Sequence, residues 1–161
     1  MNQALSKDIV LDFLETKEGG QLYHRESRTL EFKEAFNFAG LADYFRDFAA
    51  FANNAGGYLV FGVTNSPRKP CGLTEKSADM FERIDEAKIS EFLNQIFVPS
   101  INWERAAINY KGKTFGAFYV HESSEKPVVA KKDEDDVIRN GEIYYSMPAA
   151  PKRFCLLNLM P

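Results

Sequence analysis

The sequence predicts one α+β domain, in which a mixed β-sheet is packed by about three helices. Apolar residues recur with helical spacing in three separate segments, and residues 58–63 form an unbroken apolar run typical of a central strand covered on both faces. The last third of the chain is typical of strands, with a turn at residues 111–113. A length of 161 residues suits one hydrophobic core, and no internal repeat or linker divides the chain.

Each of the three expected helices has an apolar stripe and a stop signal. Ser6 caps the first helix, which ends at the glycine pair 19–20. The second helix ends before the glycine pair 56–57, and the third spans roughly residues 85–96 and is closed by Pro99. The stripes are Ile9, Val10, Phe13 and Leu14, then Leu41, Phe45, Phe48 and Ala52, then Ile89, Phe92, Leu93 and Ile96.

The expected strands span residues 29–33, 58–63, 101–110, 115–121, 128–129 and 143–145. The two strands on either side of the turn at 111–113 form a hairpin. In the first strand, alternate side chains share a face, so Leu30 and Phe32 can enter the core. Glu31 and Lys33 then stand together on the opposite face.

The composition indicates a globular cytoplasmic protein. A hydrophobic fraction of 45% is enough for a packed core and argues against disorder. No apolar run approaches the roughly 20 residues that span a bilayer, and the N-terminus shows no signal peptide. Cys71 and Cys155 lack metal-ligand spacing, so we expect buried thiols in a reducing cytoplasm.

The first candidate site is the acidic strand. Glu31 and Lys33 lie close to a Gly-rich helix-to-strand turn, an arrangement more typical of a site than of a solvated edge. Glu26 can join them only if residues 24–28 bend, because an odd separation along a straight strand sends two side chains to opposite faces. The alternative is that Glu31 and Lys33 form a surface ion pair, worth at most ~1 kcal/mol, while Glu26 is simply solvated.

Several short motifs follow one another along nearly the whole chain, residues 5–155. They are Glu26, Glu31-Phe32-Lys33, Ala50-Phe51-Ala52-Asn53, Gly56-Gly57, Phe61-Gly62-Val63, Cys71-Gly72-Leu73, Lys126-Pro127, Val137-Ile138-Arg139-Asn140-Gly141 and Ala149. In this order they resemble the AlbA-type domain of Schlafen and Schlafen-like bacterial proteins. The resemblance implies binding of nucleic acid, DNA or RNA, mainly through phosphate contacts from Lys and Arg. It also implies a role in transcriptional regulation, and a homodimer that recreates the groove between Schlafen's two lobes.

The residues expected to contact nucleic acid are basic. They are Arg25, Arg28, Lys33, Arg68, Lys69 and Arg139. The net charge of −3 gives no overall basic footprint, but acidic residues concentrate elsewhere, notably at 133–136. Arg139 can hold a phosphate with two N–H groups or pair with those acids, and both interpretations stay open.

The resemblance also implies a second function, because the family members that cut RNA use two glutamates and an aspartate. Glu26 and Glu31 match the glutamates, and Lys33 matches the neighbouring lysine of this catalytic group. The third position is Asn65, and Mg²⁺ or Mn²⁺ prefers anionic oxygens, so a metal held by Glu26, Glu31 and Asn65 is bound weakly. The site is an impaired catalytic site, a binding relic, or neither. Two acids of the following helix could supply a replacement ligand: Asp43 and Asp47.

Three hypotheses follow: a nucleic-acid-binding module, a metal-dependent endoribonuclease impaired by Asn65, and a dimerisation module. The apolar residues 156–161 are either a tail, which could meet a partner, or the start of a missing segment. Residues 53–57 either present backbone N–H groups to an anion or merely end a helix. His24 either assists proton transfer or is an ordinary surface histidine. Aromatic residues in the strands either stack on bases or pack in the core.

Overall fold

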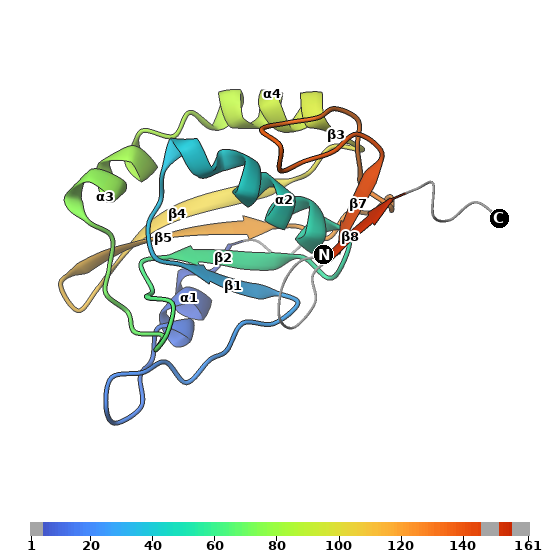
Figure 1. Cartoon of the computed structure of the whole chain (residues 1–161). Helices are drawn as coiled ribbons and strands as arrows, with labels where there is room; N and C mark the ends of the chain where they lie inside the picture. The colour runs from blue at the N-terminus through green and yellow to red at the C-terminus, as the bar shows by residue number, and fades with distance from the viewer. Residues whose placement is uncertain (1–4, 146–151, 156–161) are drawn as a thin grey trace.

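The computed structural model describes residues 5–145 and the backbone of residues 152–155. Its centre is a four-stranded sheet in the order β1-β2-β5-β4 (Figure 1). The strands are β1 (Leu30–Lys33), β2 (Gly57–Phe61), β5 (Lys113–Val120) and β4 (Trp103–Tyr110). β1 runs parallel to β2, whereas β2, β5 and β4 pair antiparallel, so the sheet is mixed as expected.

Helices cover both faces of this sheet. Figure 1 shows α2 (Leu41–Ala52), α3 (Glu75–Glu82) and α4 (Glu86–Ile96) on one side and α1 (Lys7–Phe13) on the other. Successive residues of β2 point to opposite faces, so Leu59 packs with the α2 cluster while Val60 packs with the α1 cluster. All five residues of β2 are buried, which confirms the prediction of a central strand covered on both faces.

Shorter elements complete the described chain. The strands β3 (Phe97–Val98) and β6 (Val129–Ala130) form one two-stranded sheet, and β7 (Glu142–Tyr145) and β8 (Lys152–Cys155) form another. A 3₁₀ turn, η1 (Phe38–Gly40), leads into α2. No helix among the described residues is long and apolar enough to cross a membrane.

The helix predictions are confirmed for α2 and α4, except that Phe92 of the α4 stripe is 51% exposed instead of buried. Two further corrections are needed. The first helix begins after its Ser6 cap as expected but ends at Phe13, and the glycine pair 19–20 lies in the loop that follows. This loop closes on itself, because the Lys17 amide donates to the carbonyl of Gln21 at 2.7 Å. The second correction is α3, a fourth α-helix that the sequence did not predict; it is capped by Thr74.

The predicted hairpin is confirmed and turns tightly. Tyr110 is paired with Lys113, so only two residues connect β4 to β5. Both connecting residues have left-handed backbones, with φ of 50° at Lys111 and 77° at Gly112. A two-residue turn of this kind matches the right-handed twist of the flanking strands.

The segment at residues 53–57 has a structural role at the end of α2, which is one of the two interpretations that the sequence allowed. Asn53 is buried, and its side-chain amide donates to the carbonyls of Val128 and Tyr144 at 3.0 Å each. Its side-chain oxygen accepts from the Val128 amide at 2.6 Å. The amides of Asn54 and Gly56 donate back to Phe51, so they are already satisfied within the helix end.

Two further expectations concern cysteines and aromatic residues. The expectation of a buried Cys71 is wrong, because its side chain is exposed in the loop before α3; the side chain of Cys155 and the apolar residues 156–161 lie outside the described residues. Core packing is confirmed for Tyr119 and Tyr144, which are 6% and 0% exposed, whereas Tyr145 is 39% exposed.

Candidate nucleic-acid interface

A tight bend brings the two glutamates together. The amide of Ser27 donates to the carbonyl of Leu30 at 2.9 Å, which turns the chain immediately before β1. Glu26, just before this bend, and Glu31, within β1, therefore line the same pocket of about 460 Å³. Glu26 and Glu31 thus converge in the structure, through the bend that the sequence required at residues 24–28.

The same pocket collects most of the residues expected to act together. Its lining residues are Glu26, Glu31, Phe32, Lys33, Glu34, Val63, Thr64, Asn65 and Arg68. They come from β1 and from the loop after β2, which meet because those two strands are parallel neighbours. Among the lining side chains, three carboxylates face two cationic groups, so the pocket is slightly acidic.

Lys33 is held between two carboxylates. Its ammonium nitrogen lies 3.4 Å from Glu31 on its own strand and 3.4 Å from Asp47 on α2. Asp47 is 1% exposed and makes no hydrogen bond of good geometry with the described residues, so the contact with Lys33 is an ion pair only. The interpretation of Glu31 and Lys33 as a surface ion pair is therefore incomplete. The pair is partly buried, and Asp47 of α2 is a third member.

Burial perturbs the titration of all three groups. It raises the pKa of Asp47 to about 7, with the negative charge of Glu31 adding to the effect and Lys33 opposing it. Burial also raises the pKa of Glu31, again against the opposing charge of Lys33. For Lys33, burial acts to lower the pKa, but the carboxylates of Asp47 and Glu31 outweigh it and the pKa is raised. The carboxyl of Asp47 is therefore partly protonated near neutral pH, while Lys33 stays charged.

Arg68 forms the boundary between this pocket and a second one. Its guanidinium donates to Glu26 at 2.9 Å, and its backbone carbonyl accepts from the amide of Leu22. The second pocket, of about 300 Å³, shares Arg68 and Asn65 with the first. It is further lined by Lys17, Gln21, Leu22, His24, Arg25, Ser66 and Pro67. The described lining of the second pocket contains no acidic residue.

The remaining basic residues are placed differently. Arg28 is exposed in the bend before β1, and Lys69 is exposed in the loop after β2. Arg139 pairs with Asp136 at 3.4 Å and lines neither pocket. Of its two interpretations, the structure therefore agrees with pairing to the acidic segment at residues 133–136. Arg28, Arg68 and Lys69 therefore belong to the region around β1, and Arg139 does not.

The donor set does not fit a divalent cation in this arrangement. Among residues 5–145, no group of three or more His, Cys, Asp or Glu side chains is arranged to hold a metal ion. Glu26 is occupied by Arg68, Glu31 is occupied by Lys33, and Asn65 offers only a neutral amide oxygen. Mg²⁺ and Mn²⁺ prefer anionic oxygens, so these pairs would have to break first.

The other polar candidates are held by local partners. Asp43 pairs with Arg46 at 3.3 Å on the surface of α2, so of the two α2 acids only Asp47 reaches the acidic strand. His24 pairs with Asp12 at 3.1 Å. His24 lines the second pocket but not the first, so it does not lie among Glu26, Glu31 and Lys33.

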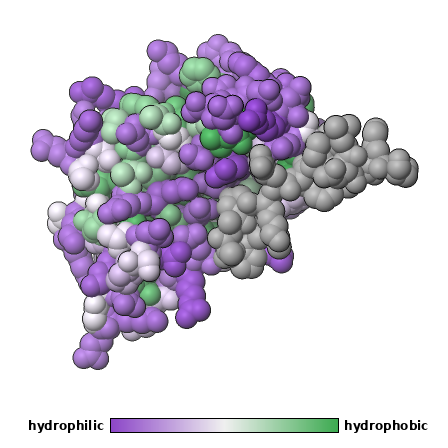
Figure 2. Space-filling model, in the orientation of Figure 1, coloured by the Kyte–Doolittle hydropathy of each residue, from purple (hydrophilic) through white to green (hydrophobic). Residues whose placement is uncertain are grey.

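Hydrophobic surface on the visible face gathers around α2 (Figure 2). Phe38 and Phe92, which are 39% and 51% exposed, line a separate pocket of about 270 Å³. Glu134 and Asp135 lie at its edge, so its chemistry is apolar and acidic. This pocket is unsuited to phosphate and is distinct from the region around β1.

Comparison with known proteins identifies the family. The model of the family described as Schlafen, AlbA_2 matches residues 26–148, so the chain belongs to the Schlafen AlbA_2 family. Uncharacterized ATP-binding protein UU034 of Ureaplasma parvum is 38% identical over 150 residues, covering 84% of this chain and 41% of that protein. The chain thus spans about two-fifths of this relative. The DIP2311 protein of Corynebacterium diphtheriae has the same fold, with a TM-score of 0.58 at 15% identity over 90% of this chain and 25% of its own.

Proposed function

We propose that this domain binds nucleic acid through the basic side chains around the loop at residues 64–70, without cutting it. The observation that carries this proposal is the position of Arg68 between two adjoining pockets, with Arg25 and Lys17 on its far side. Membership of the Schlafen AlbA_2 family supports a nucleic-acid-related function. Contacts of this kind go to phosphates and carry no sequence information, so we expect little sequence preference from them.

The charge distribution supports a path for the phosphates along the second pocket. In the first pocket Glu26, Glu31 and Glu34 outnumber Lys33 and Arg68, so a phosphate placed deep within it is repelled. The second pocket offers cationic side chains without acids in its described lining. A nucleic-acid strand is therefore expected to contact Arg25 and Arg68 and to leave the acidic strand at its edge.

The proposal predicts a loss of binding when these two arginines are neutralised. The variant Arg25→Gln/Arg68→Gln should weaken binding of a fluorescent oligonucleotide to a similar extent for every sequence. With a single-stranded oligonucleotide it should also reduce the slope of log affinity against log salt by about 1.4, because each phosphate contact contributes about 0.7. The control Lys88→Gln/Lys132→Gln removes the same charge from exposed positions in α4 and after β6. Equal affinity in both variants would contradict the proposal.

Cleavage is the second candidate function, and it is favoured only by the convergence of Glu26 and Glu31. With Asn65 in the third position, we expect the wild-type protein to retard RNA in the presence of Mn²⁺ and leave it intact. Asn65→Asp supplies a third carboxylate, and cutting gained by that variant would mark a lapsed nuclease. Cutting by the wild type that disappears in Glu31→Ala would contradict the proposal of binding alone.

A role in transcriptional regulation and assembly as a homodimer stay predictions from the family. A dimer would place two copies of the Arg68 region on one nucleic acid and so strengthen binding without new contacts. The apolar pocket at Phe38 and Phe92 is a candidate contact surface for such a dimer. Light scattering of the purified protein measures the mass directly, and a monomer at all concentrations would exclude this arrangement.

A further inference from the structure

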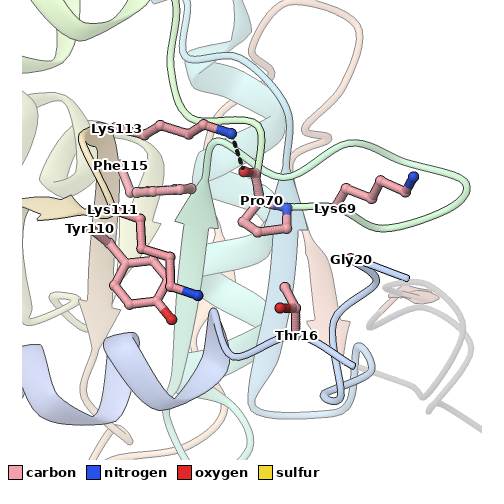
Figure 3. A pocket seen from close by; sticks show the side chains of 8 residues that line it. All are labelled: Thr16, Gly20, Lys69, Pro70, Tyr110, Lys111, Lys113 and Phe115. Carbon is pink, nitrogen blue, oxygen red and sulfur yellow. Dashed lines mark hydrogen bonds between the residues drawn. The ribbon is translucent and has the colours of Figure 1, made fainter. Parts of the chain in front are cut away.

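A third pocket lies at the end of the sheet where β4 turns into β5. It has a volume of about 330 Å³ and is lined by Thr16, Gly20, Lys69, Pro70, Tyr110, Lys111, Lys113 and Phe115. Three segments distant in sequence meet there: the loop after α1, the loop after β2, and the β4–β5 turn (Figure 3). No residue of the acidic strand contributes to its described lining.

The three lysines of this pocket lack carboxylate partners within the described residues. Lys113 donates to the carbonyl of Pro70 at 3.3 Å, and Lys111 lies 5.2 Å from the ring of Tyr110. No ion pair involves Lys69, Lys111 or Lys113 in the described part of the chain, whereas Lys33 and Arg68 are both paired. Lysines without carboxylate partners beside one hollow give it a positive potential and favour an anion.

The side chains are directed so that an anion can meet them. Figure 3 shows the ammonium of Lys111 and the hydroxyl of Thr16 facing the same space beside Pro70, while Lys69 extends outward along its loop. The ring of Phe115 forms part of the apolar wall. The pocket thus combines cationic groups with an apolar surface, as expected for a site that takes the phosphate of a nucleotide.

The turn itself favours a role for Lys111. Its φ of 50° lies in the left-handed region, where Asn, Asp and Gly are the usual residues of a two-residue hairpin turn. Gly112 follows this preference, but Lys111 does not. Lys111 thus places a long cationic side chain at a position where a shorter residue suits the backbone better.

We propose that this pocket is a second phosphate subsite, which holds the backbone of the same nucleic-acid strand beyond Arg68. The inference rests on the proposed function and extends it to the β4–β5 turn. The loop at residues 64–70 connects the two places, because Arg68 lines the second pocket and its neighbour Lys69 lines the third. A strand that passes over this loop therefore meets Arg25 and Arg68 first, and then Lys69, Lys111 and Lys113.

The test uses a variant that suits the fold. Lys111→Asn places a preferred residue in the left-handed position, and Lys113→Gln keeps a side chain of similar length, so the double variant should remain folded. Its affinity for a single-stranded oligonucleotide in 50 mM salt should fall roughly tenfold, and the magnitude of its salt slope should fall by about 1.4, since each phosphate contact of a single strand contributes about 0.7. The control variant Lys88→Gln/Lys132→Gln should retain wild-type affinity.

The outcomes separate this inference from the proposed function. If Arg25→Gln/Arg68→Gln weakens binding and Lys111→Asn/Lys113→Gln matches the control, the subsite is wrong and the proposed function stands. If neither variant differs from the control, both are wrong. Pyrophosphate provides a further arm: if the turn variant weakens pyrophosphate binding but leaves oligonucleotide binding unchanged, the pocket takes a small phosphate compound and the strand subsite is refuted.

Discussion

At the scale of single residues, Asp47 is a carboxylic acid on the inner face of α2, 3.4 Å from the ammonium of Lys33. Its pKa is raised from 3.8 to about 7, chiefly by burial. Between these two values the folded protein holds a proton that the unfolded chain has lost. The free energy of unfolding therefore decreases as pH rises from about 4 to about 7.

The variant Asp47→Asn should remove this dependence. It keeps the shape of the side chain and leaves Lys33 paired with Glu31, so the free energy of unfolding at pH 8 should rise by roughly 1–3 kcal/mol. Urea denaturation at pH 5 and pH 8 measures the difference. A variant less stable than the wild type at pH 8 would show instead that the ionised Asp47 stabilises the fold.

The pair between Glu26 and Arg68 gives a second prediction at this scale. Glu26→Gln removes a negative charge and releases the guanidinium from a contact of 2.9 Å, so binding of an oligonucleotide should become several-fold tighter. Glu34→Gln is the matched control, because Glu34 lines the same pocket but forms no ion pair with the described residues, so this change removes a charge without releasing a cation. Fluorescence anisotropy compares the two, and weaker binding by Glu26→Gln would contradict the account.

At the scale of elements, Asn53 joins the end of α2 to Val128, just before β6, and to Tyr144 of β7. Asn53→Ala leaves the amide and carbonyl of Val128 and the carbonyl of Tyr144 without this partner in a buried place. The free energy of unfolding should fall by roughly 2–4 kcal/mol. Asn54→Ala, one residue further along, should change it by less than about 0.5 kcal/mol. Equal effects in urea denaturation would overturn the structural role of Asn53.

The sequence predicts the elements that bury a continuous apolar stripe. The helices α2 and α4 and the hairpin of β4 and β5 follow from such patterns. Helix α3 was not predicted because only Ser77 and Phe81 are buried in it, too few to form a stripe. The first helix was predicted too long because glycines mark loop tips as well as helix ends, and here they lie in a loop.

The site was partly predictable for a related reason. The alternation along β1 and the bend before it place Glu26, Glu31 and Lys33 correctly, since both are local features of the chain. The contact of Lys33 with Asp47 depends on how α2 packs against β1, and the pocket at Lys111 depends on which loops meet at the end of the sheet. Neither arrangement follows from local spacing.

At the scale of the whole molecule, charge is sorted by location. The net charge is −3. The pocket beside Arg25 and Arg68 and the pocket at the β4–β5 turn nevertheless both have basic linings, and both adjoin the loop at residues 64–70. Acidic residues concentrate at 133–136, where Arg139 is paired. We therefore expect a polyanion to bind through this basic region, with an affinity that falls as ionic strength rises.

The salt dependence of oligonucleotide binding by the wild-type protein therefore tests the central claim most directly. If about five basic side chains contact phosphates of a single strand, log affinity should fall linearly with log salt, with a slope of about −3 to −4. Anisotropy titrations between 50 and 200 mM salt give this slope. Binding that is absent at 50 mM salt, or that does not change with salt, would contradict the account.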